Sequence, residues 1–188
     1  EGFYTILDDV FALAKTGVND AGYILQTRYN ASGAKVRGIN TELKIGIPSV
    51  FELQAGYTFQ RSLYNEPEEW SDAVKAERKM FRTPDHYAYF TASADITKQF
   101  KASLFGNYTG RMLVQHNAGY IAEDRSELAP SFWDMGAQLA YKFYLTEAIN
   151  LELSGGVKNI FDSFQNDIDR GANRDSVYIF GPMMPRTF

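Results

Sequence analysis

The chain has 188 residues, a formal net charge of −4, two histidines and no cysteine. The missing cysteines exclude a disulfide framework and a thiolate zinc site, and the mildly acidic balance argues against a nucleic-acid partner, which would require a basic face. No run of about 18 apolar residues occurs, which excludes a transmembrane helix but not a β-barrel, whose strands cross a membrane with about 9–11 alternating residues each.

The first quarter of the chain is its least regular part. Phe3–Leu13 predicts one strand, and Tyr23–Ile47 predicts a second, longer strand. We expect the second strand to bend near Ser32 and Gly33, because glycine adopts backbone conformations that other residues avoid.

Five later segments alternate between apolar and polar residues, which is the pattern of a strand with one apolar face. The apolar positions of the first are Phe51, Leu53, Ala55, Tyr57 and Phe59. The other four segments cover residues 87–96, 100–112, 133–143 and 149–158. The sequence therefore predicts an all-β fold in which about eight antiparallel strands form an up-and-down meander.

Short and long connections alternate between these segments. Short turns are predicted at residues 48–49, 97–98 and 146–147, and long loops at Asn65–Asp85, Asn117–Ser131 and Asp162–Val177. Short turns at one end and long loops at the other are typical of outer-membrane barrels. The first long loop has good helix formers after Pro67, a composition that favours a short helix there.

The alternation alone does not say which way the apolar face points, since a soluble barrel or sandwich turns it inward and a membrane barrel turns it outward. Three features favour the membrane: the apolar positions carry no charge along their middle, they are rich in alanine and glycine, and aromatic residues bracket them. The bracketing pairs are Phe51 and Phe59, Phe100 and Tyr108, and Trp133 and Tyr141. In tilted strands these pairs would form two aromatic girdles roughly 20 Å apart. A soluble core would also lack charge, so both alternatives stay open at this point.

Several segments carry a resemblance to a known family. The end of the chain reads GGVKNIFDSFQND and then RGANRDSVYIFGPMMPRTF. Upstream stand NASGAKVRGINTEL (Asn30–Leu43), RTPDHYAYF (Arg82–Phe90) and GNYTGRMLVQH (Gly106–His116). Taken in chain order, the segments resemble the C-terminal strands of TonB-dependent outer-membrane receptors of Gram-negative bacteria. Those receptors end in a Lys-Asn-Ile/Leu-Phe-Asp strand, an outer loop and a Gly-Pro…Pro-Arg-Thr-Phe strand.

The resemblance implies a 22-stranded barrel with an N-terminal plug domain and a TonB box. On this basis residues 1–188 are expected to form the last eight or so strands, without the plug. The positions that alternate before Phe188 hold Arg186, Met184 and Pro182, and the prolines interrupt strand pairing. The final strand is therefore expected to be truncated at Phe188.

The function that the resemblance implies is TonB-dependent uptake of a scarce, bulky nutrient across the outer membrane: an iron chelate, haem, a cobalamin-like cofactor or a glycan. The implied partners are the TonB complex, acting through the plug, the small-molecule or oligosaccharide substrate, and outer-membrane lipid; a surface lipoprotein is a further candidate. No nucleic acid and no cofactor are expected. The alternatives are a soluble β-barrel or sandwich that binds a ligand, and a complete small eight-stranded outer-membrane barrel.

Candidate substrate contacts lie where a transporter would capture its cargo. Arg111 is predicted to face the lumen, and four residues lie in the outer loops: His116, Tyr120, Arg170 and Arg174. A polar loop residue is more often simply solvated than a ligand, and that interpretation stands beside the functional one.

The last long loop also offers a candidate for calcium. Asp167, Asp169 and Asp175 supply carboxylate oxygens, but their spacing lacks the glycine and the terminal glutamate of an EF-hand, so a solvated loop is the favoured interpretation. No catalytic residue is predicted. His86 and His116 lie far apart in the sequence, and no Gly-x-Ser-x-Gly elbow accompanies them.

Overall fold

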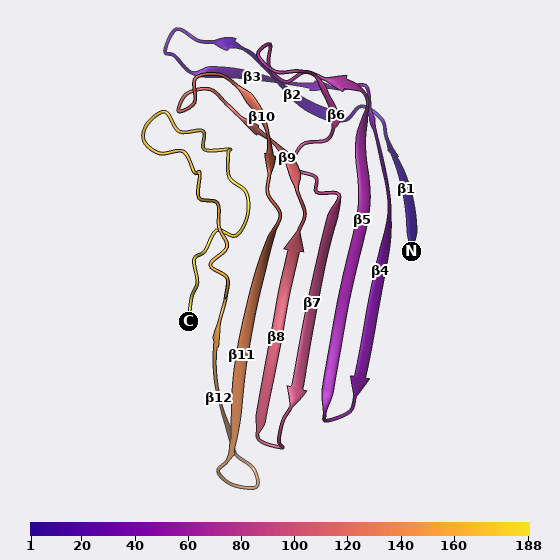
Figure 1. Cartoon of the computed structure of the whole chain (residues 1–188), viewed down its shortest axis with the longest axis vertical. Coiled ribbons are helices and arrows are strands. Elements are labelled where there is room, and N and C mark those ends of the chain that lie inside the picture. Colours follow the sequence, from indigo (N-terminus) through magenta and orange to yellow (C-terminus); the bar gives the residue numbers. More distant parts are fainter.

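The computed structural model describes residues 1–188 and consists of strands and their connections (Figure 1). The strands are β1 (Gly2–Leu7), β2 (Phe11–Val18), β3 (Ile24–Asn30), β4 (Ala34–Ile47), β5 (Phe51–Glu68), β6 (Glu77–Lys79), β7 (His86–Asp95), β8 (Phe100–Thr109), β9 (Met112–His116), β10 (Arg125–Ala129), β11 (Phe132–Tyr144) and β12 (Asn150–Val157). No helix long and apolar enough to cross a membrane is present.

One antiparallel sheet forms a wall in the order β1-β4-β5-β7-β8-β11-β12, and β6 pairs with the end of β5. From β4 onward each wall strand pairs with the next wall strand along the chain, which confirms the predicted meander. The remaining strands form two hairpins, β2–β3 and β9–β10. The wall is open, with β1 at one edge and β12 at the other, so the chain does not close into the small eight-stranded barrel considered as an alternative.

The register places the apolar positions of neighbouring strands on one face of the wall. Paired positions form continuous rows, of which one is Ile45, Leu53, Ala92, Leu104, Ala137 and Val157. The adjacent row on the opposite face is Glu52, Ser93, Ser103, Gln138 and Gly156. The alternation in the sequence thus becomes an apolar face and a polar face, as predicted.

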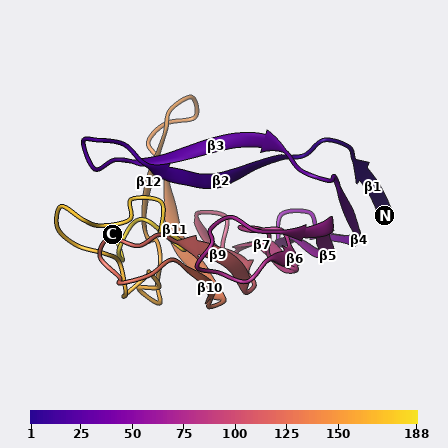
Figure 2. The same ribbon diagram turned by 90° about the horizontal axis from the view of Figure 1, so that it is seen from above.

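The wall curves around its polar face. Figure 2 shows the strands as an arc, with the β2–β3 hairpin crossing the concave side at the end of the long loops. Hollows along the wall contain side chains of the polar face, such as Lys101, Lys142 and Glu152 in one and Lys44, Glu52 and Ser93 in another. The apolar face is therefore convex, which is the arrangement of a barrel with a wet interior.

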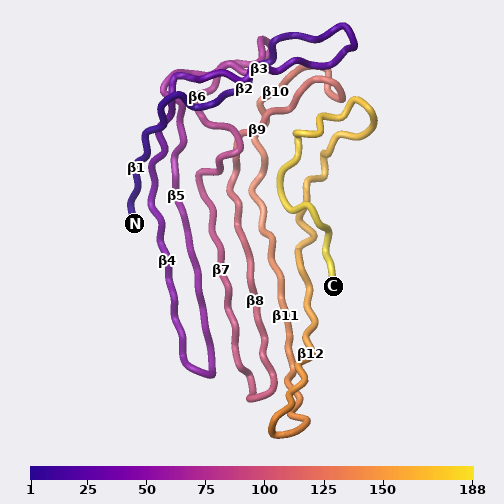
Figure 3. The backbone as a smooth tube through the Cα atoms, turned by 180° about the vertical axis from the view of Figure 1, so that it is seen from behind, coloured from indigo at the N-terminus to yellow at the C-terminus, as the bar shows by residue number.

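The connections are arranged as predicted. The turns between β4 and β5, β7 and β8, and β11 and β12 lie together at one end, and the long connections and both hairpins lie at the other (Figure 3). The aromatic pairs lie near the two ends of the apolar face: Tyr108 is opposite Trp133, with ring centroids 5.0 Å apart, and Phe100 is opposite Tyr141.

The prediction of one strand over Phe3–Leu13 and one over Tyr23–Ile47 is wrong. The first is split into β1 and β2 by Asp9, which has a φ of 53°. The second is split into β3 and β4 at Gly33, which has a φ of 89°. A Cβ at Gly33 would lie 2.7 Å from the carbonyl oxygen of Leu7, so glycine is required there for close packing as well as for its φ. The predicted bend is in the right place, but there the chain returns from the β2–β3 hairpin to the wall, which it left between β1 and β2.

The short helix favoured by the composition after Pro67 does not form. β5 continues to Glu68, and the following residues make turns before β6. Trp70 is buried, packs edge-on against Phe81 at 6.4 Å and donates a hydrogen bond from Nε1 to Ser126 Oγ at 3.1 Å. These tertiary contacts outweigh the local helix propensity. Of the expected final strand, only an isolated bridge between Lys158 and Thr187 forms.

Candidate functional site

The long-loop end of the wall carries a packed layer that we call the loop cap, consisting of the β2–β3 hairpin, residues 69–85, the β9–β10 hairpin and residues 158–182. Its apolar cluster contains Val114, Ala129, Tyr178 and Phe180, with Met112 against it. These residues come from the β9–β10 hairpin and the C-terminal loop. The packing fixes those two segments against one another and thereby positions the polar groups around them.

Asp124 joins three parts of the loop cap. Its carboxylate lies 3.1 Å from Lys15 Nζ of β2, accepts a hydrogen bond from Ser71 Oγ, and accepts another from the Ala118 backbone N–H at 2.6 Å. The Lys15 backbone N–H also donates to the Trp70 carbonyl at 3.1 Å. The Asp124 side chain is only 4% exposed, so a single buried carboxylate holds the β2–β3 hairpin, the segment after β5 and the tip of the β9–β10 hairpin together.

The pKa of the Asp124 carboxyl lies below its ordinary value of 3.8. Burial alone would raise this pKa, because it disfavours the charged form. The hydrogen bonds from Ala118, Ser71 and Lys15, together with the charge of Lys15, outweigh burial and stabilise the carboxylate. Asp124 is therefore ionised at neutral pH.

His116 joins the β9–β10 hairpin to the C-terminal loop. Its Nε2 lies 3.1 Å from both carboxylate oxygens of Asp169, and its ring stacks on Tyr178 with the centroids 3.6 Å apart. The Tyr178 hydroxyl donates to Asp167 at 2.9 Å, and burial together with that carboxylate raises the pKa of Tyr178. His116 is 5% exposed. A substrate would reach its ring only after the loops separate, so its predicted role as a substrate contact requires such an opening.

The three carboxylates proposed for calcium are engaged by protein donors. Asp167 accepts from Tyr178, Asp169 accepts from the Asp175 N–H at 2.9 Å, and Asp175 accepts from both the backbone and side-chain nitrogens of Asn117. No group of three or more acidic, histidine or cysteine side chains is arranged to hold a metal ion. These hydrogen bonds link residues of the C-terminal loop to one another and to Asn117, and calcium binding by the three carboxylates stays a prediction.

The other predicted substrate contacts do not converge on one point. Arg111, Tyr120, Arg170 and Arg174 are exposed, and Arg174 donates to the Gly171 carbonyl at 3.1 Å. Their positions at the long-loop end of the wall fit capture from outside, and their role as substrate contacts stays a prediction.

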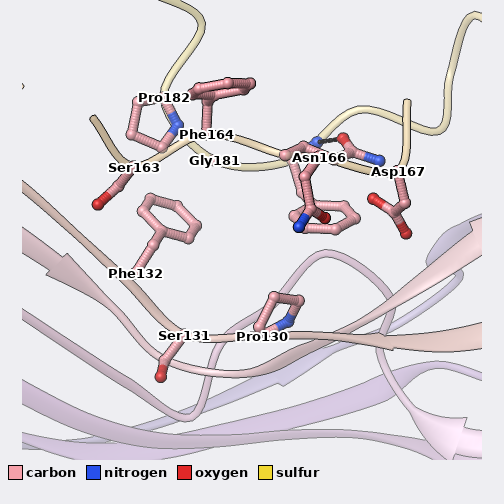
Figure 4. A pocket seen from close by; sticks show the side chains of 11 residues that line it. Pro130, Ser131, Phe132, Ser163, Phe164, Asn166, Asp167, Gly181 and Pro182 are labelled. Carbon is pink, nitrogen blue, oxygen red and sulfur yellow. Dashed lines mark hydrogen bonds between the residues drawn. The ribbon is translucent and has the colours of Figure 1, made fainter. Parts of the chain in front are cut away.

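A cavity of about 300 Å³ lies between the β10–β11 connection and the C-terminal loop (Figure 4). Its lining is aromatic, amide and hydroxyl in character and contains no basic side chain; it includes Ser131, Phe132, Ser163, Phe164, Asn166 and Asp167. In Figure 4 the Phe132 ring and the Asn166 amide lie on facing walls. Of the residues singled out from the sequence as site candidates, only Asp167 lines this cavity. The other residues that line the cavity could not be identified from the sequence, because this requires knowing which loops lie next to each other.

Replacing His116 with alanine is expected to loosen the C-terminal loop. The change removes the stack on Tyr178 and leaves the buried Asp169 carboxylate without its histidine partner, which should lower the local opening free energy by about 1–3 kcal/mol. Hydrogen-exchange mass spectrometry should show faster exchange in residues 112–129 and 162–180. Tyr120→Ala, at a residue 57% exposed, serves as the control. Unchanged exchange in residues 162–180 would contradict this role.

Comparisons with known proteins agree with this architecture. A family model described as TonB dependent receptor-like, beta-barrel matches residues 1–160. The ferric-catecholate import receptor Fiu from E. coli K12, in its closed form, matches with a TM-score of 0.62 and 19% identity over 97% of this chain and 23% of that chain. The copper transporter OprC matches with a TM-score of 0.59 and 14% identity over 86% of this chain and 22% of that chain. The siderophore receptor PirA from Acinetobacter baumannii matches with a TM-score of 0.57 and 16% identity, covering 86% and 25%.

The chain thus spans about a quarter of the length of these structures. At these identities the likeness concerns the fold. No curated protein matches the sequence significantly.

Proposed function

Since the chain belongs to the TonB-dependent receptor β-barrel family, we propose that it forms part of the wall of an outer-membrane transporter that imports a scarce nutrient. Members of this family lie in the outer membrane of Gram-negative bacteria and act as transport receptors, not as enzymes. For this chain we propose the same location and the same type of activity.

The observation that supports the proposal best is the pairing of curvature with polarity. The wall is concave on its polar face and convex on its apolar face, and apolar side chains such as Leu139 and Leu153 are more than half exposed. A soluble binding module would bury this face in a core. Bilayer hydrocarbon is the solvent in which an exposed apolar convex wall is stable.

The free edges of the wall support the proposal that further strands complete it. The outer backbone groups of β1 and β12 are unpaired within the sheet, and in hydrocarbon each unsatisfied backbone group costs several kcal/mol. We propose that residues 1–188 are the last strands of a larger, 22-stranded barrel. On this proposal a plug domain elsewhere in the receptor contacts TonB, and TonB pulls on that plug.

For the substrate we propose a bulky metal chelate, with haem, a cobalamin-like cofactor and a glycan as alternatives. The support is that the similar structures include a ferric-catecholate import receptor, a siderophore receptor and a copper transporter. We propose that exposed side chains at the long-loop end of the wall make the first contacts; they include Arg111, Tyr120, Arg170 and Arg174. A covering surface lipoprotein would contact the same end of the wall.

Uptake measurements in cells test the proposal. Deleting the gene that encodes the receptor should reduce accumulation of one radiolabelled substrate, from a panel of ferric and copper chelates, haem, cobalamin and oligosaccharides, to the level of a TonB-deficient strain. Restoring the gene should restore uptake only when TonB is present. Recovery of the receptor in the soluble fraction, or uptake that persists without TonB, would contradict the proposal.

A further inference from the structure

The cavity between the β10–β11 connection and the C-terminal loop presents hydrogen-bonding groups that the protein leaves unused. Asn166 is exposed and its side-chain amide makes no hydrogen bond within the chain, and neither do the hydroxyls of Ser131 and Ser163. One carboxylate oxygen of Asp167 accepts from the Tyr178 hydroxyl at 2.9 Å, and the other oxygen has no partner. Hydroxyl and amide groups both donate and accept, whereas a carboxylate only accepts. The complementary ligand therefore carries several groups that donate and accept at the same time, as hydroxyls do.

Gln165 holds this part of the C-terminal loop in place. It is 5% exposed, its Nε2 donates to the Tyr178 carbonyl at 3.3 Å, and its Oε1 accepts from the Phe180 N–H at 2.9 Å. Phe180 in turn belongs to the apolar cluster of the loop cap. Asn166 and Asp167 directly follow this anchored residue, so their backbone positions are set before a ligand arrives. A preformed site loses less conformational entropy on binding than one that the ligand must order.

Size and shape suit a single ring. The cavity volume of about 300 Å³ lies at the lower end of the range for ligand pockets, which is about 300–1,000 Å³. The ring of Phe132 stands on the wall opposite Asn166 (Figure 4). The face of an aromatic ring is partly negative, and the C–H groups of a sugar ring are partly positive because each carbon bears an oxygen. A sugar ring can therefore stack on Phe132 while its hydroxyls reach the amide and the carboxylate.

The charges around the cavity favour an uncharged ligand. The lining contains no lysine or arginine, and its one titratable side chain is Asp167. Phe132 lies on the concave face of the wall, in the row that also contains Asn40, Thr58, Tyr87 and Thr109. The next row toward the short turns contains Glu42, Gly56, Tyr89, Asn107 and Asp134. Neither row contains a basic residue, so an anionic ligand would find no counter-charge in the cavity or directly below it.

We propose that the cavity binds one uncharged sugar ring of the cargo. The Asn166 amide and the free oxygen of Asp167 form hydrogen bonds with its hydroxyls, and Phe132 packs against its C–H face. An anionic ring, such as a catecholate or a uronic acid, is disfavoured because the cavity holds a carboxylate and no cation. The site rests on the proposed function in one respect, the entry of cargo at the long-loop end. Within that proposal, the part of the cargo held here is uncharged and hydroxylated, as every ring of a neutral glycan is.

Saturation-transfer-difference NMR on the full receptor in detergent tests the site. The probes are the methyl glycosides of glucose, galactose, mannose and N-acetylglucosamine, together with glucuronic and galacturonic acid. At least one neutral glycoside should bind, and more tightly than either uronic acid. Asn166→Ala should weaken that binding about fivefold, the effect of one lost hydrogen bond, and Phe132→Leu should weaken it to a similar extent by removing the aromatic face. Asn173→Ala removes an exposed amide from the same loop outside the cavity and, as the matched control, should leave binding unchanged.

A charge variant tests the selectivity separately. Asp167→Asn keeps an oxygen that accepts from the Tyr178 hydroxyl and removes the negative charge from the cavity. The affinity for the two uronic acids should rise about fivefold, because a repulsion between like charges a few ångströms apart is relieved. An affinity for uronic acids that does not change would contradict the role of Asp167 in excluding anions.

Three outcomes would overturn the proposal: no neutral glycoside binds, a uronic acid binds more tightly than every neutral glycoside, or Asn173→Ala weakens binding as much as Asn166→Ala and Phe132→Leu do. Failure of the proposed function gives a different result. Glycoside binding by a receptor that supports no TonB-dependent uptake would contradict the transport function alone. TonB-dependent uptake by a receptor that binds no glycoside would contradict the sugar site alone.

Discussion

Replacing Leu104 with arginine is expected to lower the free energy of unfolding of the lipid-embedded receptor by about 2–4 kcal/mol, which is the cost of a lipid-facing arginine near the bilayer midplane. Leu104 lies on the convex face of β8, in register with Ala92 and Ala137 and far from both ends of the strand. Its side chain is 39% exposed, and no other layer of the protein covers the row to which it belongs. Urea titration of the full receptor, refolded into phospholipid vesicles and followed by tryptophan fluorescence, measures the change.

Ser103→Arg is the matched control, because Ser103 is adjacent in the same strand and points to the concave, polar face. We expect this variant to fold within about 0.5 kcal/mol of the unmodified protein, as surface substitutions usually do. If Ser103→Arg were the more damaging change, the assignment of the two faces would be reversed. If the unmodified receptor refolded fully in buffer without lipid or detergent, the apolar face would belong to a soluble core.

Replacing Asp124 with asparagine is expected to release the β2–β3 hairpin from the loop cap. Lys15 would lose its counter-charge while remaining only 21% exposed, and the hydrogen bonds from Ser71 and Ala118 would lose their charged acceptor. Breaking such a set should lower the local opening free energy by about 2–4 kcal/mol. Hydrogen-exchange mass spectrometry should show faster exchange at residues 11–30, 69–74 and 116–124, with the wall strands unchanged.

Lowering the pH should release the β2–β3 hairpin in the same way as Asp124→Asn, because protonation also removes the charge of this carboxylate. The folded-state pKa of Asp124 lies below 3.8, so its stabilising contribution is complete above about pH 4 and is lost as the pH falls through the folded-state pKa. After correction for intrinsic exchange rates, protection in the three segments should fall below about pH 4 in the unmodified receptor and stay constant in Asp124→Asn. Asp72→Asn makes the same change of charge at an exposed neighbour and should keep the pH dependence. Identical pH profiles for the unmodified protein and Asp124→Asn would contradict the assignment.

The wall was predictable from the sequence because strand geometry repeats every second residue. Between Phe51 and Val157 each strand presents one apolar and one polar face, and short turns such as Pro48–Val50 leave little freedom in the register. Local pattern and global fold therefore give the same answer in this part of the chain. The direction of the apolar face was not predictable in this way, because it depends on the curvature of the assembled sheet.

The loop cap was not predictable, because its structure depends on contacts between residues far apart in the chain and not on a local pattern. Asp9 adopts a positive φ that composition does not reveal, and the helix formers after Pro67 are overruled by the burial of Trp70. His116 was expected in an outer loop and is buried against Asp169, which lies 53 residues further along the chain. The pairing of Lys15 with Asp124 could not be predicted from the sequence, because neither residue belongs to a recognisable motif and only the fold brings them together.

The separation of 109 residues between Lys15 and Asp124 has a consequence for the order in which the molecule assembles. Closing a loop of that length in an unfolded chain costs about 4 kcal/mol in entropy, as much as one partly buried ion pair with its hydrogen bonds can return. The wall strands face no such barrier, because short turns join the hairpins β4–β5, β7–β8 and β11–β12. Once these hairpins are joined side by side, the segments that carry Lys15 and Asp124 are already held near each other. The contact between Lys15 and Asp124 is thus a product of the finished wall and contributes nothing to its nucleation.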